Sequence, residues 1–155
     1  MRFENLSEDQ RYRFLQRLHK KLNKEVFNGD LEEIIVDVRD ITKNRDIKLF
    51  ACYSRDPQQY YQRYGIFFSF EFVDRIKLLK TQKEQALYIV QTLLHEMIHQ
   101  YCHENGIDDT DHSDEWQRVA AEHQLHSIYH NGEMVEEWLD GLSIPGIIIS
   151  NLKIQ

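Results

Sequence analysis

Residues 81–106 read TQKEQALYIVQTLLHEMIHQYCHENG and predict one long helix. Thr81 and Glu84 have the spacing of a capping box at its start, and Gly106 is a natural stop at its end. Apolar side chains recur at helical spacing between these signals, at Ala86, Ile89, Val90, Leu93, Leu94, Met97, Ile98 and Tyr101. Because these side chains cover much of the circumference, we expect this helix to lie in the centre of the domain.

The middle of this helix carries the motif H-E-x-x-H, from His95 to His99. The two histidines lie one turn apart on the same face, where their imidazoles can bind one zinc ion. Glu96 lies about 100° around the helix, so it can reach a zinc-bound water without ligating the metal. Zinc lowers the pKa of its water, and a nearby carboxylate can accept the proton. The motif therefore predicts metal-assisted hydrolysis, in preference to a core helix whose histidines are only hydrogen-bonded.

A catalytic zinc usually has three protein ligands, so a third ligand must lie outside the motif. The spacing favours His112, because this residue follows a loop that contains Gly106 and precedes another predicted helix. Three alternatives stay open: Glu122 on that next helix, His123, and His103. His103 continues the histidine row, but it is about 12 Å from His95 along the helix axis.

The flanking sequence predicts an α+β domain with a small sheet of three or slightly more strands, packed on the central active-site helix. Ser7 and Gln10 begin an N-terminal helix that ends at Asn28-Gly29. Short runs rich in Ile, Val, Phe and Tyr predict strands over residues 34–38, 47–53 and 64–70. Ser113 can cap a third helix that extends to about Ser127. A strand over residues 147–149 is expected near the end of the chain.

Composition and charge narrow the class of protein. The 155 residues fit one domain, and they contain neither an 18-residue apolar run nor the apolar core of a signal peptide. The two cysteines form no C-x-x-C pair. These features predict a cytoplasmic protein without membrane contact, and they leave the oligomeric state open. Residues 1–83 hold 17 Lys/Arg against 13 Asp/Glu, whereas residues 84–155 hold 2 against 13.

The basic side chains of the N-terminal half gather on one face of its helix, at Arg11, Arg13, Arg17, Lys20, Lys21 and Lys24. We expect at most a weak DNA contact there, with nearby aromatics such as Phe67 and Phe68 as candidates for stacking on bases. A solvated helix face and a packed strand explain the same residues and are the preferred interpretation.

The segment 92–99, followed by His112 and Trp116, resembles the SprT-like zinc metallopeptidase domain family, which includes the Spartan-type proteases. The resemblance covers roughly residues 10–128. It implies a zincin-like minimal metallopeptidase with one catalytic Zn²⁺, with His95, His99 and His112 as ligands and Glu96 as general base. The chain departs from the family in having Ser113 where glycine often follows the third histidine. It also lacks the C-x-x-C of the C-terminal zinc ribbon that many members carry.

These observations lead to one functional hypothesis and two rivals. Residues 1–128 are expected to form the metallopeptidase domain, and residues 129–155 an extension packed on it. The domain would hydrolyse peptide bonds of a protein or peptide through a zinc-bound water activated by Glu96, with DNA-associated proteins as one substrate class. The first rival is a non-catalytic, zinc-stabilised module that binds DNA or protein. The second is a zinc hydrolase with another substrate, since H-E-x-x-H specifies the water and not the substrate.

Overall fold

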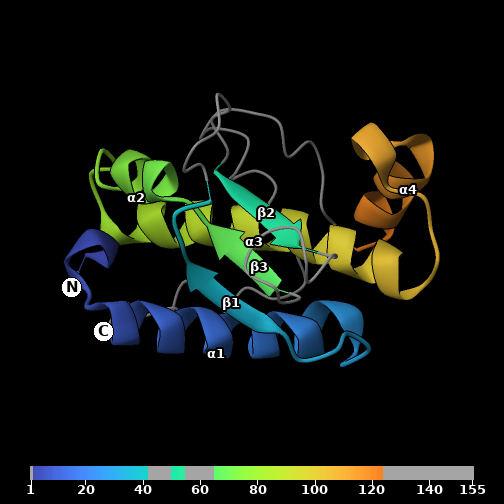
Figure 1. Cartoon of the computed structure of the whole chain (residues 1–155), viewed down its shortest axis with the longest axis horizontal. Helices are drawn as coiled ribbons and strands as arrows, with labels where there is room; N and C mark the ends of the chain where they lie inside the picture. The colour runs from blue at the N-terminus through green and yellow to red at the C-terminus, as the bar shows by residue number, and fades with distance from the viewer. Residues whose placement is uncertain (1, 42–49, 55–64, 124–155) are drawn as a thin grey trace.

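The computed structural model describes residues 2–41, 50–54 and 65–123. This part of the chain is an α+β domain with a small three-stranded mixed sheet, as the sequence predicts, but it has four α-helices where the sequence predicts three (Figure 1). The elements in chain order are the 3-10 turn η1 (Phe3–Asn5), α1 (Glu8–Phe27), β1 (Ile35–Val38), β2 (Ala51–Ser54), β3 (Gly65–Phe68), α2 (Phe70–Ile76), α3 (Gln82–Glu104), the 3-10 turn η2 (Thr110–His112) and α4 (Asp114–Glu122).

The strands follow the order β1-β3-β2, so the last of the described strands lies in the middle. β3 pairs parallel with β1 and antiparallel with β2. All four residues of β3 are buried, which fits its unbroken apolar run. Gly65 allows β1 to approach, because a Cβ at this position would lie 2.8 Å from the Ile35 carbonyl oxygen. β2 lies at one edge of the sheet in the described part of the chain.

Helix α3 is the central element and passes behind the sheet in Figure 1, with α2 and α4 toward its opposite ends. It contacts β2, α1 and α4, and thirteen of its residues are buried. At its start, Thr81 Oγ1 accepts a hydrogen bond from the Glu84 N–H (3.1 Å), but the Glu84 carboxylate accepts from Lys80 rather than from Thr81. The expected capping box is therefore only half formed. At its end, Gly106 adopts the left-handed φ of 66° that favours glycine.

Helix α1 has both of its predicted ends. Ser7 and Gln10 form the complete capping box, and Asn28 adopts a left-handed conformation at the C-terminus (φ 56°). Leu15, Leu18 and Leu22 are fully or almost fully buried against the sheet and α3. Beyond the helix, the Asn23 side chain hydrogen-bonds both the N–H and the carbonyl of Leu31 (3.0 and 2.9 Å). This bond pair directs the chain from α1 into β1.

Two predicted boundaries are wrong. The apolar run 64–70 predicts one strand, but β3 ends at Phe68 and α2 begins at Phe70. Ser69 is the reason, because its hydroxyl accepts from the Phe72 N–H (3.1 Å) and caps a helix whose apolar residues resemble a strand. Helix α4 ends at Glu122 instead of about Ser127.

The proposed extension 129–155 lies outside the described residues. None of the described helices is long and apolar enough to cross a membrane.

Candidate metal centre

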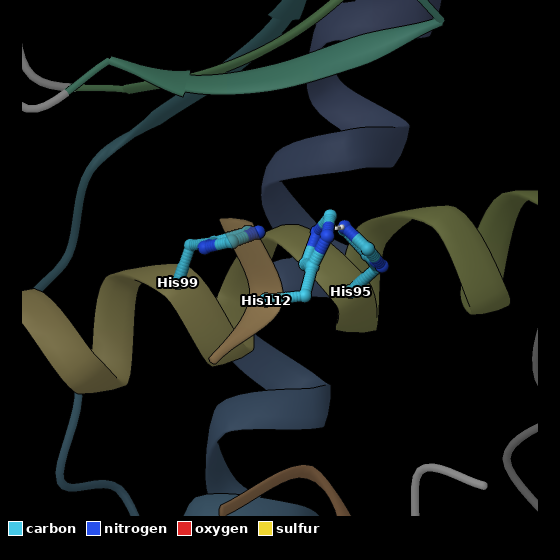
Figure 2. A group of neighbouring side chains, drawn as sticks. All are labelled: His95, His99 and His112. Atoms are coloured by element: carbon cyan, nitrogen blue, oxygen red, sulfur yellow. Dashed lines mark hydrogen bonds between the residues drawn. The ribbon is translucent and has the colours of Figure 1, made fainter. Parts of the chain in front are cut away.

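Three imidazoles from two separate elements converge at one point beside α3 (Figure 2). His95 and His99 project from successive turns of α3, and His112 comes from η2. The Nε2 atoms of His95 and His112 lie 3.0 Å apart. One nitrogen from each histidine can be chosen so that all three lie within 4.8 Å of one another. The structure thus brings together the two histidines of the motif and the favoured third residue.

His112 reaches this cluster through an unusual turn. Asp111 and His112 both have left-handed backbone conformations, with φ values of 50° and 53°. Such conformations in non-glycine residues are uncommon and occur where surrounding contacts hold them. Here the Gln117 side chain donates to the His112 carbonyl (3.0 Å), so the start of α4 holds the turn in place.

Ser113 fixes the other side of this turn. Its hydroxyl donates to the Asp108 carbonyl (2.6 Å) and accepts from the Trp116 N–H (3.2 Å), which makes it the N-cap of α4. Its backbone has φ −50° and ψ 167°, a conformation that needs no glycine. Serine therefore fits this position without backbone strain, where the family that the sequence resembles often has glycine, and it adds a helix cap.

Trp116 forms a wall of the cluster. Its ring centroid lies 4.6 Å from that of His112, 5.1 Å from His95 and 5.3 Å from His99, and its side chain is almost completely buried. An indole packed against all three imidazoles restricts their rotation. The packing of α4 on α3 therefore helps to set the geometry of the cluster.

Sequence reasoning missed one residue that contacts the cluster, Asp109. Aspartates in a loop are mostly exposed, yet Asp109 is only 6% exposed. Its Oδ2 lies 2.7 Å from Nδ1 of His99. The neighbouring Asp108 and Asp111 are exposed, as expected for that loop. No spacing rule separates one aspartate of this loop from the others; only the turn of the backbone does.

Glu96 lies beside the cluster rather than in it. Glu96 is 7% exposed, and its Oε1 atom lies 4.0 Å from Nε2 of His95. This distance is too long for a hydrogen bond. The carboxylate therefore lies close to the cluster on the side of His95. Glu96 is not one of the three residues whose ligand atoms converge.

The alternative third ligands lie elsewhere in the described structure. The Nδ1 atom of His103 is 2.8 Å from the Tyr53 hydroxyl, and the ring is exposed. Glu122 is exposed and pairs with Arg118 (3.3 Å). His123 stacks on Phe27, lies tilted against Tyr101 and hydrogen-bonds the Val119 carbonyl. None of the three belongs to the histidine cluster.

The electrostatics of the cluster suit a cation. Burial, together with the adjacent His99 and His112 rings, lowers the pKa of His95 from 6.5 to about 3. Burial also lowers the pKa of His112, against the opposing effect of Asp109 and Asp111. Both rings are therefore neutral at pH 7 and offer lone pairs. Imidazole nitrogens around a tetrahedral zinc lie about 3.4 Å apart for bonds of 2.0–2.1 Å, so the observed donor set fits this ion.

Comparison with known proteins identifies the family of this chain. A family model described as the SprT-like family matches residues 15–131, well over half of the chain. No curated protein and no solved structure gave a significant match. The matched region contains the whole of α3, η2 and α4, and with them every residue of the cluster.

Proposed function

Because the chain belongs to the SprT-like family, we propose that it is a zincin-like, zinc-dependent metallopeptidase. His95, His99 and His112 would hold one catalytic Zn²⁺. The observation that carries the proposal is the convergence of these imidazoles on one point with the buried Glu96 carboxylate next to them. Three protein ligands that leave a coordination position open are typical of catalytic zinc, whereas structural zinc usually has four.

The bound ion would lower the pKa of a water molecule and polarise the carbonyl of the scissile peptide. Glu96 supplies the proton transfers. Its carboxylate accepts a proton from the attacking water as the new carbon–oxygen bond forms. It then passes this proton to the peptide nitrogen, so that the carbon–nitrogen bond breaks with a neutral amine as leaving group. The position of the buried Glu96 carboxylate, 4.0 Å from Nε2 of His95, supports this role.

A contact with DNA is a second proposal, supported by the surface of α1. Arg17, Lys20 and Lys24 are exposed and share one side of the helix. Phe67 and Phe68 are 1% and 0% exposed, so they are core residues and cannot stack on bases. Tyr60, Tyr61 and Tyr64, the other aromatics of that region, lie outside the described residues. The proposed contact is therefore electrostatic, and DNA-associated proteins are a substrate class that it would favour.

Hydrolysis of an unstructured protein such as casein tests the catalytic proposal. The zinc-loaded wild type is compared with Glu96→Gln, which keeps the size of the side chain but cannot accept the proton. Cleavage should fall by about 10²–10⁴-fold while zinc content stays the same. Glu122→Gln is the matched control, because Glu122 is an exposed carboxylate on α4 that lies outside the cluster.

The outcomes separate the rival functions. Equal cleavage by Glu96→Gln and the wild type would reject the proposed mechanism. Full zinc occupancy without cleavage, with or without single-stranded DNA, would favour the non-catalytic zinc module. Loss of zinc from Glu96→Gln would show that the carboxylate stabilises the metal site instead of serving as the base.

A further inference from the structure

We propose that Asp109 is a positioning residue of the metal centre, acting through His99. Its carboxylate accepts a hydrogen bond from Nδ1 of His99 and thereby leaves Nε2 as the nitrogen for the ion. The proposal rests on metal binding by the histidine cluster, the first part of the proposed function, and not on peptide hydrolysis.

The burial of Asp109 is the first argument. A carboxylate removed from water requires hydrogen-bonded or charged partners to offset its lost hydration. Asp109 is buried within a turn whose other acidic side chains, Asp108 and Asp111, are exposed. Its side chain is 5% exposed and that of His99 is 15% exposed, so water screens this contact little. The turn thus directs one of its three aspartates inward, onto a ring of the cluster.

The geometry of the His99 ring is the second argument. An ionised carboxylate can only accept hydrogen bonds, so the nitrogen at 2.7 Å must carry the proton. In a neutral imidazole the other nitrogen, Nε2, then has the lone pair. His95 and His112 also present Nε2 to the cluster, since these two atoms face each other at 3.0 Å. Asp109 thereby selects the tautomer of His99 that matches the other two rings.

Asp109 also connects two of the three imidazoles. Its side chain contacts His99 on α3, and its main-chain carbonyl accepts from the His112 N–H (3.3 Å). The residue therefore joins the helix to the strained turn that carries His112. Without the carboxylate, both the tautomer of His99 and the distance between the helix and the turn are less restricted.

The experiment measures zinc affinity of the full chain by competition with a chelating dye. Asp109→Asn should raise the Kd for zinc by about 10–100-fold. Asp111→Asn is the matched control, because it removes an equal charge from the same turn, and asparagine tolerates the left-handed backbone at this position. Both carboxylates act electrostatically on His112, so the control accounts for that effect. The control should change the Kd by less than about threefold, as for other surface substitutions.

Two further readouts distinguish positioning from a merely structural role. The visible absorption of the Co²⁺-substituted protein should change in Asp109→Asn and stay the same in Asp111→Asn. In the metal-free wild type, ¹⁵N NMR of the imidazoles should find the proton of His99 on Nδ1. This second measurement needs no variant, so it decides the question even if Asp109→Asn does not fold.

Wild-type zinc affinity and an unchanged Co²⁺ spectrum in Asp109→Asn would overturn the proposal, as would a proton on Nε2 of His99 in the metal-free protein. Weakened zinc binding with an intact fold would support it. The absence of protease activity in the wild type would contradict the proposed hydrolysis but leave this test unaffected, since zinc affinity is measured without turnover.

Discussion

The Nε2 atoms of His95 and His112 lie 3.0 Å apart, although the two residues are 17 positions apart in the sequence. One belongs to the middle of the most buried helix, and the other belongs to a turn in a left-handed conformation. The candidate metal centre therefore depends on a strained turn as much as on the H-E-x-x-H helix. The contacts of that turn with α3 and α4 hold the His112 imidazole next to His95 and His99.

Removal of the third imidazole should abolish tight zinc binding. We expect His112→Ala to raise the Kd for zinc by more than about 100-fold, because even residues that only support metal ligands contribute 10–100-fold. Glu122→Ala should retain full zinc, since that carboxylate is paired with Arg118 on the outside of α4. Elemental analysis of the purified variants measures the zinc content. Full zinc occupancy in His112→Ala would contradict the assignment.

Three of the four described helices are predictable at their N-termini, because each begins with a local capping signal. The signals are Ser7 with Gln10 for α1, Thr81 for α3, which also has Gly106 at its end, and Ser113 for α4. Each of them acts on neighbours three or four residues away, and such local bonds are visible in the sequence. Ser69 is an equally good cap, but it lies between two apolar aromatic runs. The continuous run of apolar residues predicts a strand there. The Ser69 hydroxyl, however, accepts a hydrogen bond from the Phe72 N–H and so begins a helix.

The histidine cluster is only partly predictable, for a related reason. The positions of His95 and His99 follow from helical periodicity, which a sequence states directly. His112 and Asp109 depend on a turn whose dihedral angles no spacing rule supplies. Asp108, Asp109 and Asp111 are chemically alike, and only the folded backbone places one of them against His99.

The wall of the cluster should contribute strongly to stability. Trp116 is 1% exposed and packs against all three imidazoles. We expect Trp116→Ala to lower the free energy of unfolding of the metal-free protein by about 3–5 kcal/mol, because it removes a large buried aromatic side chain. Urea unfolding measures the change. Tyr12→Ala is the control, since Tyr12 is 37% exposed and its removal should cost less than about 1 kcal/mol.

The metal-free protein should lose stability as the pH falls below about 6.5. Burial lowers the pKa of His19 below 6.5, and it is the main cause that lowers that of His95 to about 3. The unfolded chain therefore binds protons that the folded chain excludes. The stability from these neutral rings is complete above pH 6.5, and it decreases as the pH falls toward their folded pKa values. Each ring contributes a slope of at most about 1.4 kcal/mol per pH unit.

His19→Gln isolates one of these contributions. Nε2 of His19 lies 2.9 Å from Oε1 of Gln100, and a glutamine can offer the same amide oxygen a donor without titrating. Urea unfolding in the presence of a chelator, at several pH values between 7.5 and 5, gives the slope for each protein. The variant should show a shallower slope than the wild type. Identical slopes would show that His19 does not titrate differently on folding.

The last prediction concerns the basic side of α1, which is exposed at Arg17, Lys20 and Lys24. If this surface binds phosphates, replacing all three residues by Glu should weaken binding to single-stranded DNA. It should also reduce the slope of log affinity against log salt concentration by about 0.7 for each phosphate that the variant no longer neutralises. The matched control replaces Lys77, Lys80 and Lys83 by Glu, which changes the net charge equally at exposed positions outside α1. Fluorescence anisotropy at several salt concentrations measures both slopes.

Weaker binding confined to the α1 variant would locate the DNA-binding surface on this helix. An equal decrease in both variants would indicate attraction by net charge alone, and unchanged binding in the α1 variant would remove α1 as the DNA-binding surface.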